Sequence, residues 1–280
     1  MIPLFEIYYP KSEDELKILL NENNTVIIAG GTDVMVRIKH HVYEGGLLAS
    51  TSRIKTLSFI EEDEENIFIG SGTTLSELQD SPKINESLPM LIEAIRFIGS
   101  KQIRNRATVA GNLVNASPAA DTAVPLILFD AEITIRSLYS EKIYKLEDFI
   151  TGPGKTVLNK NEYVYSIKVK KQKKEQFSKF LKVGKRDAMA ISVASLGVVY
   201  ENEKLKVAFG SVAPTVVRVK EIEDIILNNE TKEKIVKTCL NKISPIDDVR
   251  STSKYRLTVM KNLLNRCLEI IEKEDFKDAF

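Results

Sequence analysis

The chain has 280 residues, of which 43% are hydrophobic and 28% are charged, a composition typical of a soluble globular protein with room for two domains. Its net charge of +1 excludes a general electrostatic attraction to nucleic acid or to an anionic membrane. No apolar run reaches the roughly 18 residues of a membrane span, and the first residues do not form a signal peptide, so we expect a cytoplasmic protein.

Strands and helices alternate in the first part of the chain. We expect a strand at Phe5–Tyr9 and then a helix that opens with the capping box Ser12–Glu15 and ends near Asn21. Two further short strands are expected at Val26–Ala29 and Leu47–Ser50.

The next segment combines a hairpin with helices. Leu57–Ile60 and Asn66–Gly70 are predicted to pair as strands on either side of the acidic turn Glu61–Glu65. Helices are predicted at Thr74–Gln79 and Pro89–Ile98, the second of them beginning with a first-turn proline.

The second half of the chain divides at the charged run Lys170–Glu175, which is either a domain boundary or a solvated hairpin. Strands are predicted before this run at Glu132–Leu138 and Tyr163–Lys170. After it, the pattern indicates a three-stranded antiparallel sheet and then helices from Val219 onward. The strands of that sheet are Phe177–Val183, Ile191–Tyr200 and Leu205–Val212, and the last helix runs from about Thr252 to Glu272.

Several short motifs are incomplete. Thr151–Thr156 ends like a phosphate-binding P-loop, but Phe149 stands where that motif needs its first glycine, which favours a surface turn. Gly70–Gly72 lacks the third glycine of a dinucleotide fingerprint and indicates a tight strand-to-helix turn. The only histidines, His40 and His41, are adjacent, so neither a metal site nor a nucleophilic triad is predicted from them.

The two cysteines, Cys239 and Cys267, are predicted to be reduced, buried thiols in C-terminal helices. An iron–sulfur cluster normally needs four thiolates, so this chain cannot hold one. If the protein transfers electrons, its own cofactor is therefore organic.

Two glycine turns stand out as a candidate binding site. The first turn is Ile28–Asp33, and the second is Thr108–Asn112. Each places small residues and hydroxyl groups where a strand is expected to end, so backbone N–H groups are left without ladder partners. Because glycine accepts φ > 0 and lets a ligand approach the backbone, two such turns suit a diphosphate better than a single phosphate.

The order of these motifs carries a family resemblance. Ala29–Asp33, then Gly99–Asn112, then Ser117–Asp121 resemble the FAD-binding subunit of molybdenum-containing hydroxylases, the xanthine dehydrogenase family, which includes the medium subunits of carbon monoxide and nicotinate dehydrogenases. Phe180–Arg186 with Ile191–Ala194, and the stretch from Asp247 to Arg256, resemble the C-terminal flavoprotein domain of the same family.

The resemblance implies an α+β fold. It consists of a vanillyl-alcohol-oxidase-like FAD-binding domain of two subdomains, with FAD extended between them, followed by a smaller domain of antiparallel sheet and helices. On this chain the first domain covers residues 1–170, with subdomains at about 1–55 and 56–170, and the C-terminal flavoprotein domain covers residues 175–280.

The resemblance also implies an oxidoreductase subunit that transfers electrons and is not a complete catalyst. A molybdopterin-binding large subunit oxidises the substrate, a small subunit carries 2Fe–2S clusters, and the flavin passes the electrons to NAD or another acceptor. The choice between a xanthine, carbon monoxide or nicotinate dehydrogenase stays open at this point. A flavin-free nucleotide-binding or assembly module is the alternative from another class.

The family positions that contact FAD can be carried over to this chain, on which neither a catalytic residue nor a metal ligand is expected. They are Ile27, Ile28, Ala29, Gly30, Gly31, Thr32, Asp33, Val34, Ile98, Thr108, Val109, Ala110, Gly111, Asn112, Ser117, Asp121, Val164 and Lys182.

Some of these positions have a role implied by the resemblance. Asp121 would accept hydrogen bonds from the ribityl hydroxyls, and Lys182 would place a cation near the isoalloxazine, favouring the reduced, anionic flavin. Val164 and Ile98 would form apolar walls for the ring and the adenine. Because Asp33 is anionic and should avoid phosphates, we expect it to hold its turn through backbone N–H groups.

The second turn departs from the family pattern at one position. Ala110 stands where the family has the first glycine of this turn, and alanine fits there only if φ stays negative. This is the only sequence feature that favours the flavin-free alternative. Thr32 and Thr108 supply hydroxyl donors to the two turns.

Overall fold

The computed structural model describes residues 5–22, 24–43, 45–173, 175–186, 189–225 and 230–273. Residues 1–4, Lys174 of the charged run and residues 226–229 of the predicted helical region therefore lie outside the described residues. The chain forms two compact units, each assembled from separate stretches of sequence. Unit 1 is Met1–Asn85, Gly99–Ala116 and Asp130–Lys171, and unit 2 is Glu86–Ile98, Ser117–Phe129 and Gln172–Phe280. The domain bounds 1–170 and 175–280 remain our proposal.

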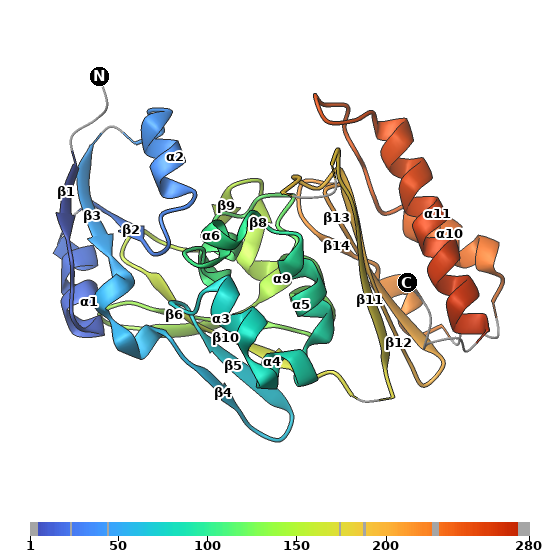
Figure 1. The fold of residues 1–280 in the computed structure, drawn as a ribbon, viewed down its shortest axis with the longest axis horizontal. Coiled ribbons are helices and arrows are strands. Elements are labelled where there is room, and N and C mark those ends of the chain that lie inside the picture. Colours follow the sequence, from blue (N-terminus) through green and yellow to red (C-terminus); the bar gives the residue numbers. More distant parts are fainter. Residues whose placement is uncertain are drawn as a thin grey trace. The chain divides into compact units, whose positions relative to one another are not determined.

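Unit 1 begins with a small parallel sheet, in the strand order β1 (Phe5–Tyr8), β3 (Gly46–Ser50) and β2 (Thr25–Ile28). Helix α1 (Glu13–Glu22) joins β1 to β2, and α2 (Val34–Lys39) joins β2 to β3 (Figure 1). Parallel strands need such crossover connections, and helices supply them here, although only β2 and β3 are neighbours in the sheet. The three predicted strands are thus confirmed.

The first helix forms for the reasons that the sequence indicates. The Ser12 hydroxyl accepts a hydrogen bond from the backbone N–H of Glu15 at 3.2 Å. Leu16 and Leu20 are then buried against β3 residue Ala49 in one apolar cluster. This packing attaches the helix to the small sheet.

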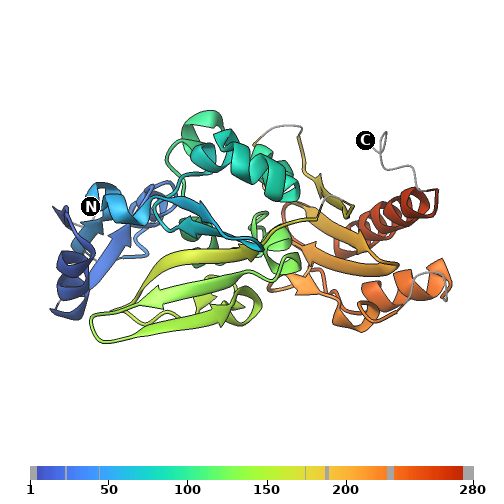
Figure 2. The same ribbon diagram turned by 90° about the horizontal axis from the view of Figure 1, so that it is seen from below.

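The second sheet of unit 1 is antiparallel and has five strands (Figure 2). In spatial order these are β4 (Ile60–Glu62), β5 (Asn66–Gly70), β10 (Tyr163–Lys170), β6 (Glu132–Arg136) and β7 (Glu141–Lys145).

The first hairpin of this sheet differs from the prediction. Leu57 belongs to a short 3₁₀ helix, η2 (Lys55–Leu57), and strand β4 extends into the run that was predicted to be the turn. The reversal is tighter because the Asp63 carboxylate accepts the backbone N–H groups of Glu65 and Asn66, at 2.8 and 2.6 Å. The side chain of Asp63 therefore stabilises the acidic turn through local hydrogen bonds.

Short elements complete the connections around the two sheets. Thr74 and Glu77 form a capping box, which confirms the tight strand-to-helix turn after β5. Gly154 has φ +68 in the reversal between β8 and β9, so the P-loop-like motif is a turn. The elements are η1 (Thr51–Arg53), α3 (Leu75–Asp80), α4 (Pro82–Ser87), α6 (Lys101–Arg104), α7 (Val109–Val114), α9 (Leu146–Phe149), β8 (Ile150–Gly152) and β9 (Lys155–Thr156).

Unit 2 contains a four-stranded antiparallel sheet in chain order: β11 (Phe177–Val183), β12 (Ala194–Glu201), β13 (Lys204–Gly210) and β14 (Val217–Arg218). The predicted three-stranded sheet is confirmed and gains β14. The third strand ends earlier than predicted because Ser211 takes φ +63, which a strand cannot continue.

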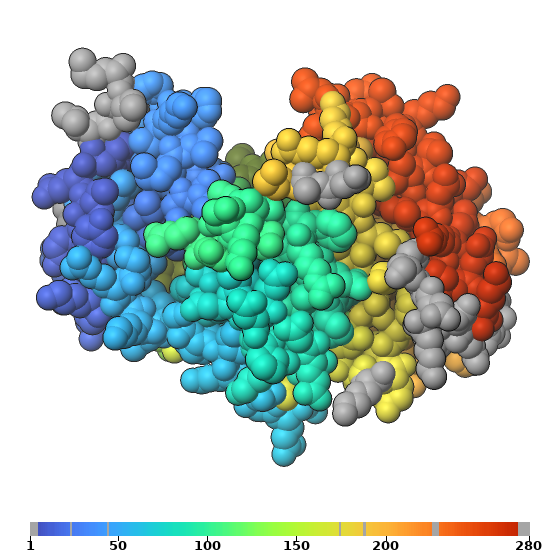
Figure 3. All heavy atoms as spheres, viewed as in Figure 1, coloured from blue at the N-terminus to red at the C-terminus, as the bar shows by residue number. Residues whose placement is uncertain are grey.

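Helices cover both faces of this sheet. On one face, α10 (Lys232–Leu240) and α11 (Ser253–Glu272) lie over an apolar core, and α11 forms the red outer surface in Figure 3. On the other face lie α5 (Pro89–Arg96) and α8 (Ala123–Leu128). A Cβ at Gly197 of β12 would lie 2.7 Å from side chains of both α5 and α8, so the sheet packs closely only with glycine there.

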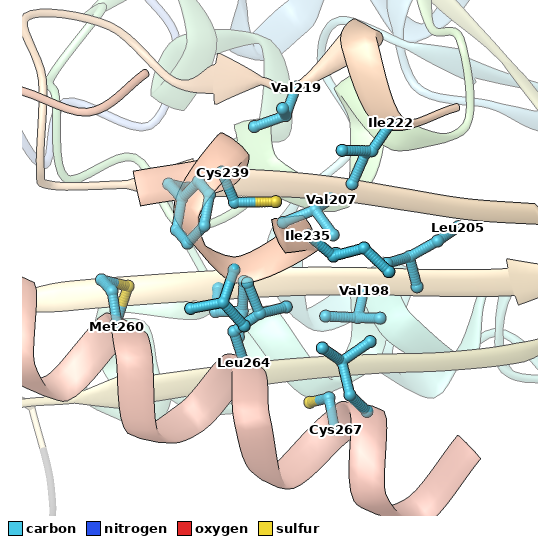
Figure 4. Packing of buried hydrophobic residues seen from close by; sticks show 14 of the residues in the cluster. Val198, Leu205, Val207, Val219, Ile222, Ile235, Cys239, Met260, Leu264 and Cys267 are labelled. Atoms are coloured by element: carbon cyan, nitrogen blue, oxygen red, sulfur yellow. The ribbon is translucent and has the colours of Figure 1, made fainter. Parts of the chain in front are cut away.

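Both cysteines point into the core between the sheet and α10 and α11 (Figure 4). Cys239 and Cys267 are free thiols, and burial raises the pKa of each to about 12. The prediction of buried, reduced thiols is confirmed. Within the described ranges, no group of three or more His, Cys, Asp or Glu side chains could hold a metal ion, and no helix is both long and apolar enough to cross a membrane.

Candidate functional site

The predicted site residues fall into two groups, one in each unit. The first group in unit 1 is the turn between the end of β2 at Ile28 and the start of α2 at Val34. Gly31 has φ +76, a backbone conformation that glycine adopts readily and other residues rarely adopt. The backbone N–H groups of Gly30, Gly31 and Thr32 have no acceptor among the residues that the structure describes. The turn therefore offers three free donors.

Gly30 also has a packing role that the sequence prediction did not include. A Cβ at this position would lie 1.9 Å from the carbonyl oxygen of Arg106 and 2.5 Å from its carbonyl carbon. Arg106 lies just before the second glycine turn, so the backbones of the two turn segments are in direct contact. The glycine is needed for this packing, whereas we had predicted close approach of a ligand.

The second turn is the start of a helix, and the prediction that it follows a strand is wrong. Thr108 is the N-cap of α7, and its Oγ1 accepts the N–H of Gly111 at 3.0 Å. Val109 and Ala110 occupy the first helical positions, where N–H groups have no intrahelical acceptor. The Val109 N–H faces Thr73 in the isolated antiparallel bridge between Thr74 and Thr108, whereas the Ala110 N–H finds no acceptor in the described part of the chain. Because Ala110 is helical, its φ is negative and alanine fits without strain.

Arg37 joins the two turns and was missed by the sequence prediction. Its Nε lies 2.7 Å from Oδ2 of Asp33, and its Nη2 donates to Oδ1 of Asn115, the C-cap of α7. Asp33 makes no side-chain cap bond, so the prediction that it holds the turn through backbone N–H groups is wrong. The i, i+4 spacing of Asp33 and Arg37 could have indicated the ion pair, but no local signal points to Asn115.

The other predicted residues of unit 1 lie in regular elements. Ile27 is half-buried in β2, and Asn112 lies within α7. Val164 is buried in β10, next to a register shift before Ser166. Their contact with a cofactor stays a prediction.

In unit 2, a buried ion pair lies at the centre of the second group. Lys182 Nζ lies 2.7 Å from Oδ2 of Asp121, and the side chains are 5% and 4% exposed. The same ammonium donates to the carbonyl oxygen of Phe97 at 3.1 Å. Ser117 accepts the backbone N–H of Ala119 at 3.2 Å, which shapes the turn that leads to Asp121.

Ser192 completes this cluster and was not among the predicted site residues. Its hydroxyl donates to Oδ1 of Asp121 at 2.5 Å. Burial raises the pKa of the Asp121 carboxyl, and the Lys182 ammonium and the Ser192 hydroxyl oppose that rise. A carboxylate has about four acceptor positions, so Asp121 keeps acceptor capacity for ligand hydroxyls.

Comparison with known proteins identifies the family. Residues 3–170 match the family described as the FAD binding domain in molybdopterin dehydrogenase, and residues 179–271 match the CO dehydrogenase flavoprotein C-terminal domain. The chain belongs to the FAD-binding subunits of the molybdenum hydroxylase family. This confirms the predicted family membership, the α+β fold, the oxidoreductase class and the FAD cofactor.

Individual relatives are similar along most of the chain. The xanthine dehydrogenase FAD-binding subunit of Escherichia coli O157:H7 is 30% identical over 91% of each chain. The nicotinate dehydrogenase FAD-subunit of Eubacterium barkeri is 32% identical over 69% of this chain and 68% of its own. A crystal structure of carbon monoxide dehydrogenase from Hydrogenophaga pseudoflava matches with a TM-score of 0.88 and 26% identity, over 95% of this chain and 96% of the other.

The residues of unit 1 fit the diphosphate of FAD. Its oxygens are anionic acceptors, and the free N–H groups of Gly30, Gly31 and Thr32, with that of Ala110, are unused donors among the described residues. Gly30 is fixed against the backbone of Arg106, so both sets of donors belong to one packed arrangement.

Proposed function

We propose that this chain is the electron-transferring subunit of a xanthine dehydrogenase-type molybdenum hydroxylase. It accepts electrons from 2Fe–2S clusters of a small partner subunit and passes them to NAD or another acceptor, while a molybdopterin-binding large subunit oxidises the substrate. The observation that carries this proposal is the likeness to a xanthine dehydrogenase subunit over 91% of both chains.

In this proposal the two turns of unit 1 hold the diphosphate. The N–H groups of Gly30, Gly31 and Thr32 donate to phosphate oxygens, and so does that of Ala110. Hydrogen bonds to charged groups contribute about 1.5–3 kcal/mol each. Bound FAD supplies redox chemistry that no protein side chain offers.

The polar cluster of unit 2 supplies further proposed contacts. Asp121 accepts from ribityl hydroxyls, and Lys182 provides a cation for the flavin. We also propose FAD contacts for three residues that the family resemblance places at the cofactor: Ile98, Ser117 and Val164. The ion pair fixes where both charges lie, because each side chain is held by its partner.

A nicotinate dehydrogenase-type assembly is the second candidate. The nicotinate dehydrogenase subunit has a slightly higher identity of 32%, but over only 69% of this chain. The longer match therefore favours the xanthine dehydrogenase type.

The experiment is to isolate the tagged chain from its own cells and identify what co-purifies. We expect two further subunits, molybdenum, iron and acid-released FAD, together with oxidation of xanthine by the complex. The chain expressed alone should retain FAD and oxidise neither xanthine nor nicotinate. Turnover by the chain alone, without molybdenum, would contradict the subunit assignment, and oxidation of nicotinate by the complex would favour the second candidate.

Gly31→Val should remove most of the bound FAD and leave the fold largely intact. A β-branched residue at φ +76 is strained by about 1–3 kcal/mol, and its Cβ would lie 3.3 Å from the side chain of Ile28. Flavin content per folded chain, measured by absorbance after gel filtration, checks this. Gly154→Val is the matched control, because Gly154 also has a positive φ, +68, in a turn that we do not assign to FAD. Equal flavin content in both variants would contradict the role of the first turn.

A further inference from the structure

Ser192 lies in a segment that is held tightly against the sheet of unit 2. The residue is fully buried, and its hydroxyl donates to Oδ1 of Asp121 at 2.5 Å. The next residue, Val193, donates its N–H to the carbonyl oxygen of Val183 in β11 at 2.8 Å. We had predicted that Ser192 belongs to the strand, but β12 begins only at Ala194, which leaves Ser192 free to turn toward Asp121.

A buried arginine fixes this segment from the other side. Arg256 of α11 is 1% exposed, and its Nη1 donates to the carbonyl oxygens of Val193 at 2.8 Å and Ser211 at 2.7 Å. Its Nη2 donates to Oδ1 of Asp248 at 2.6 Å. The sequence identified the stretch from Asp247 to Arg256 only by its family resemblance. In the structure, this stretch holds the backbone at Val193 and Ser211 in place.

The same arginine also supports the turn that carries Asp121. Arg256 donates to the carbonyl oxygen of Ser211. Ser211 in turn donates its N–H to the carbonyl oxygen of Pro118 at 2.9 Å. Pro118 lies three residues before Asp121. Arg256 thus fixes the backbone on both sides of the Ser192–Asp121 hydrogen bond.

We propose that Ser192 is a positioning residue that orients the Asp121 carboxylate toward the cofactor, with Arg256 holding the backbone of Ser192 in place. This inference rests on the proposed contact of Asp121 with FAD. Lys182 bonds to Oδ2 and Ser192 to Oδ1, so the two donors together fix the plane of the carboxylate. Without the Ser192 hydroxyl, the carboxylate can rotate until both oxygens face the ammonium, and its free acceptor positions no longer point toward a ligand.

The test is a double-mutant cycle on the full-length chain, read out as the Kd for FAD in titrations of the flavin-free protein. Ser192→Ala should raise the Kd about tenfold, which corresponds to about 1.4 kcal/mol. In the Asp121→Ala background the same change should have no further effect, because no side-chain oxygen remains there to accept the Ser192 hydroxyl. Ser192→Thr, which keeps the hydroxyl, should restore most of the affinity.

Ser178→Ala is the matched control, because it removes a hydrogen bond of the same kind from the same sheet, between Ser178 Oγ and Gln172 Oε1 at 2.6 Å. It should leave the Kd unchanged. If Asp121→Ala does not fold, the pair Asp121→Ala/Lys182→Met replaces it as the background, because it removes both buried charges.

Three results would separate the possible failures. A wild-type chain that binds no FAD would overturn the proposed function itself. A wild-type Kd in Asp121→Ala would overturn the Asp121 contact, and the inference with it. If FAD binding is intact but Ser192→Ala raises the Kd equally in both backgrounds, or in neither, Ser192 does not act through Asp121.

Discussion

Replacing Gly30 by alanine is expected to lower the free energy of unfolding of this chain by about 3 kcal/mol and to remove its FAD. The added Cβ would lie 1.9 Å from the carbonyl oxygen of Arg106, well inside contact distance. The obstructing atoms belong to the backbone, so no side chain can turn away to make room. The segments before α2 and α7 have to separate instead, and with them the N–H groups of both glycine turns.

Urea unfolding and flavin content per folded chain measure the two effects of Gly30→Ala. Gly152→Ala is a suitable control in the same unit, because a Cβ at Gly152 would meet nothing within 4 Å. The control should keep its FAD and its stability within about 0.5 kcal/mol. A Gly30→Ala chain with normal stability and flavin would mean that the two turn segments do not touch.

The local features of the fold could be predicted because their signals lie within a few residues. Alternation of apolar residues located β6 and β10, and the capping box at Ser12 located the start of α1. The second glycine turn was misplaced for a related reason. Small residues with a threonine suit both a strand end and a helix start, and only the cap bond to Thr108 decides between them.

The contacts that assemble the site could not be predicted, because they join residues that are far apart in the sequence. Arg37 and Asn115 are separated by 78 positions, and Ser192 and Asp121 by 71. One sequence shows that each residue can form hydrogen bonds but does not show its partner. The same limit applies to the two units, since the sequence has no boundary signal that assigns Glu86–Ile98 and Ser117–Phe129 to unit 2.

Lys182→Met should destabilise the chain by about 3–5 kcal/mol at neutral pH, because it leaves a buried carboxylate without its counter-ion. Asp121 and Lys182 are 4% and 5% exposed, so water cannot replace the lost ammonium. Lys179→Met is the control from the same strand. Lys179 pairs with Glu93 at 2.9 Å, but both side chains are about a quarter exposed, so this loss should stay near 0–1 kcal/mol.

The pH dependence of the Lys182→Met defect identifies its cause. Burial already raises the pKa of Asp121, and removing the cation that opposes this rise moves the pKa still higher. A carboxyl whose pKa is higher in the folded than in the unfolded state destabilises the fold at high pH, and protonation relieves that penalty as the pH falls through the folded-state pKa. The difference in stability between the wild type and Lys182→Met should therefore shrink as the pH is lowered from 8 toward the raised pKa of Asp121. Asp121→Asn/Lys182→Met should be more stable than Lys182→Met at pH 8, since no buried charge remains. A defect that is constant across this pH range and persists in the double variant would show that Lys182 stabilises the sheet by packing and not by its charge.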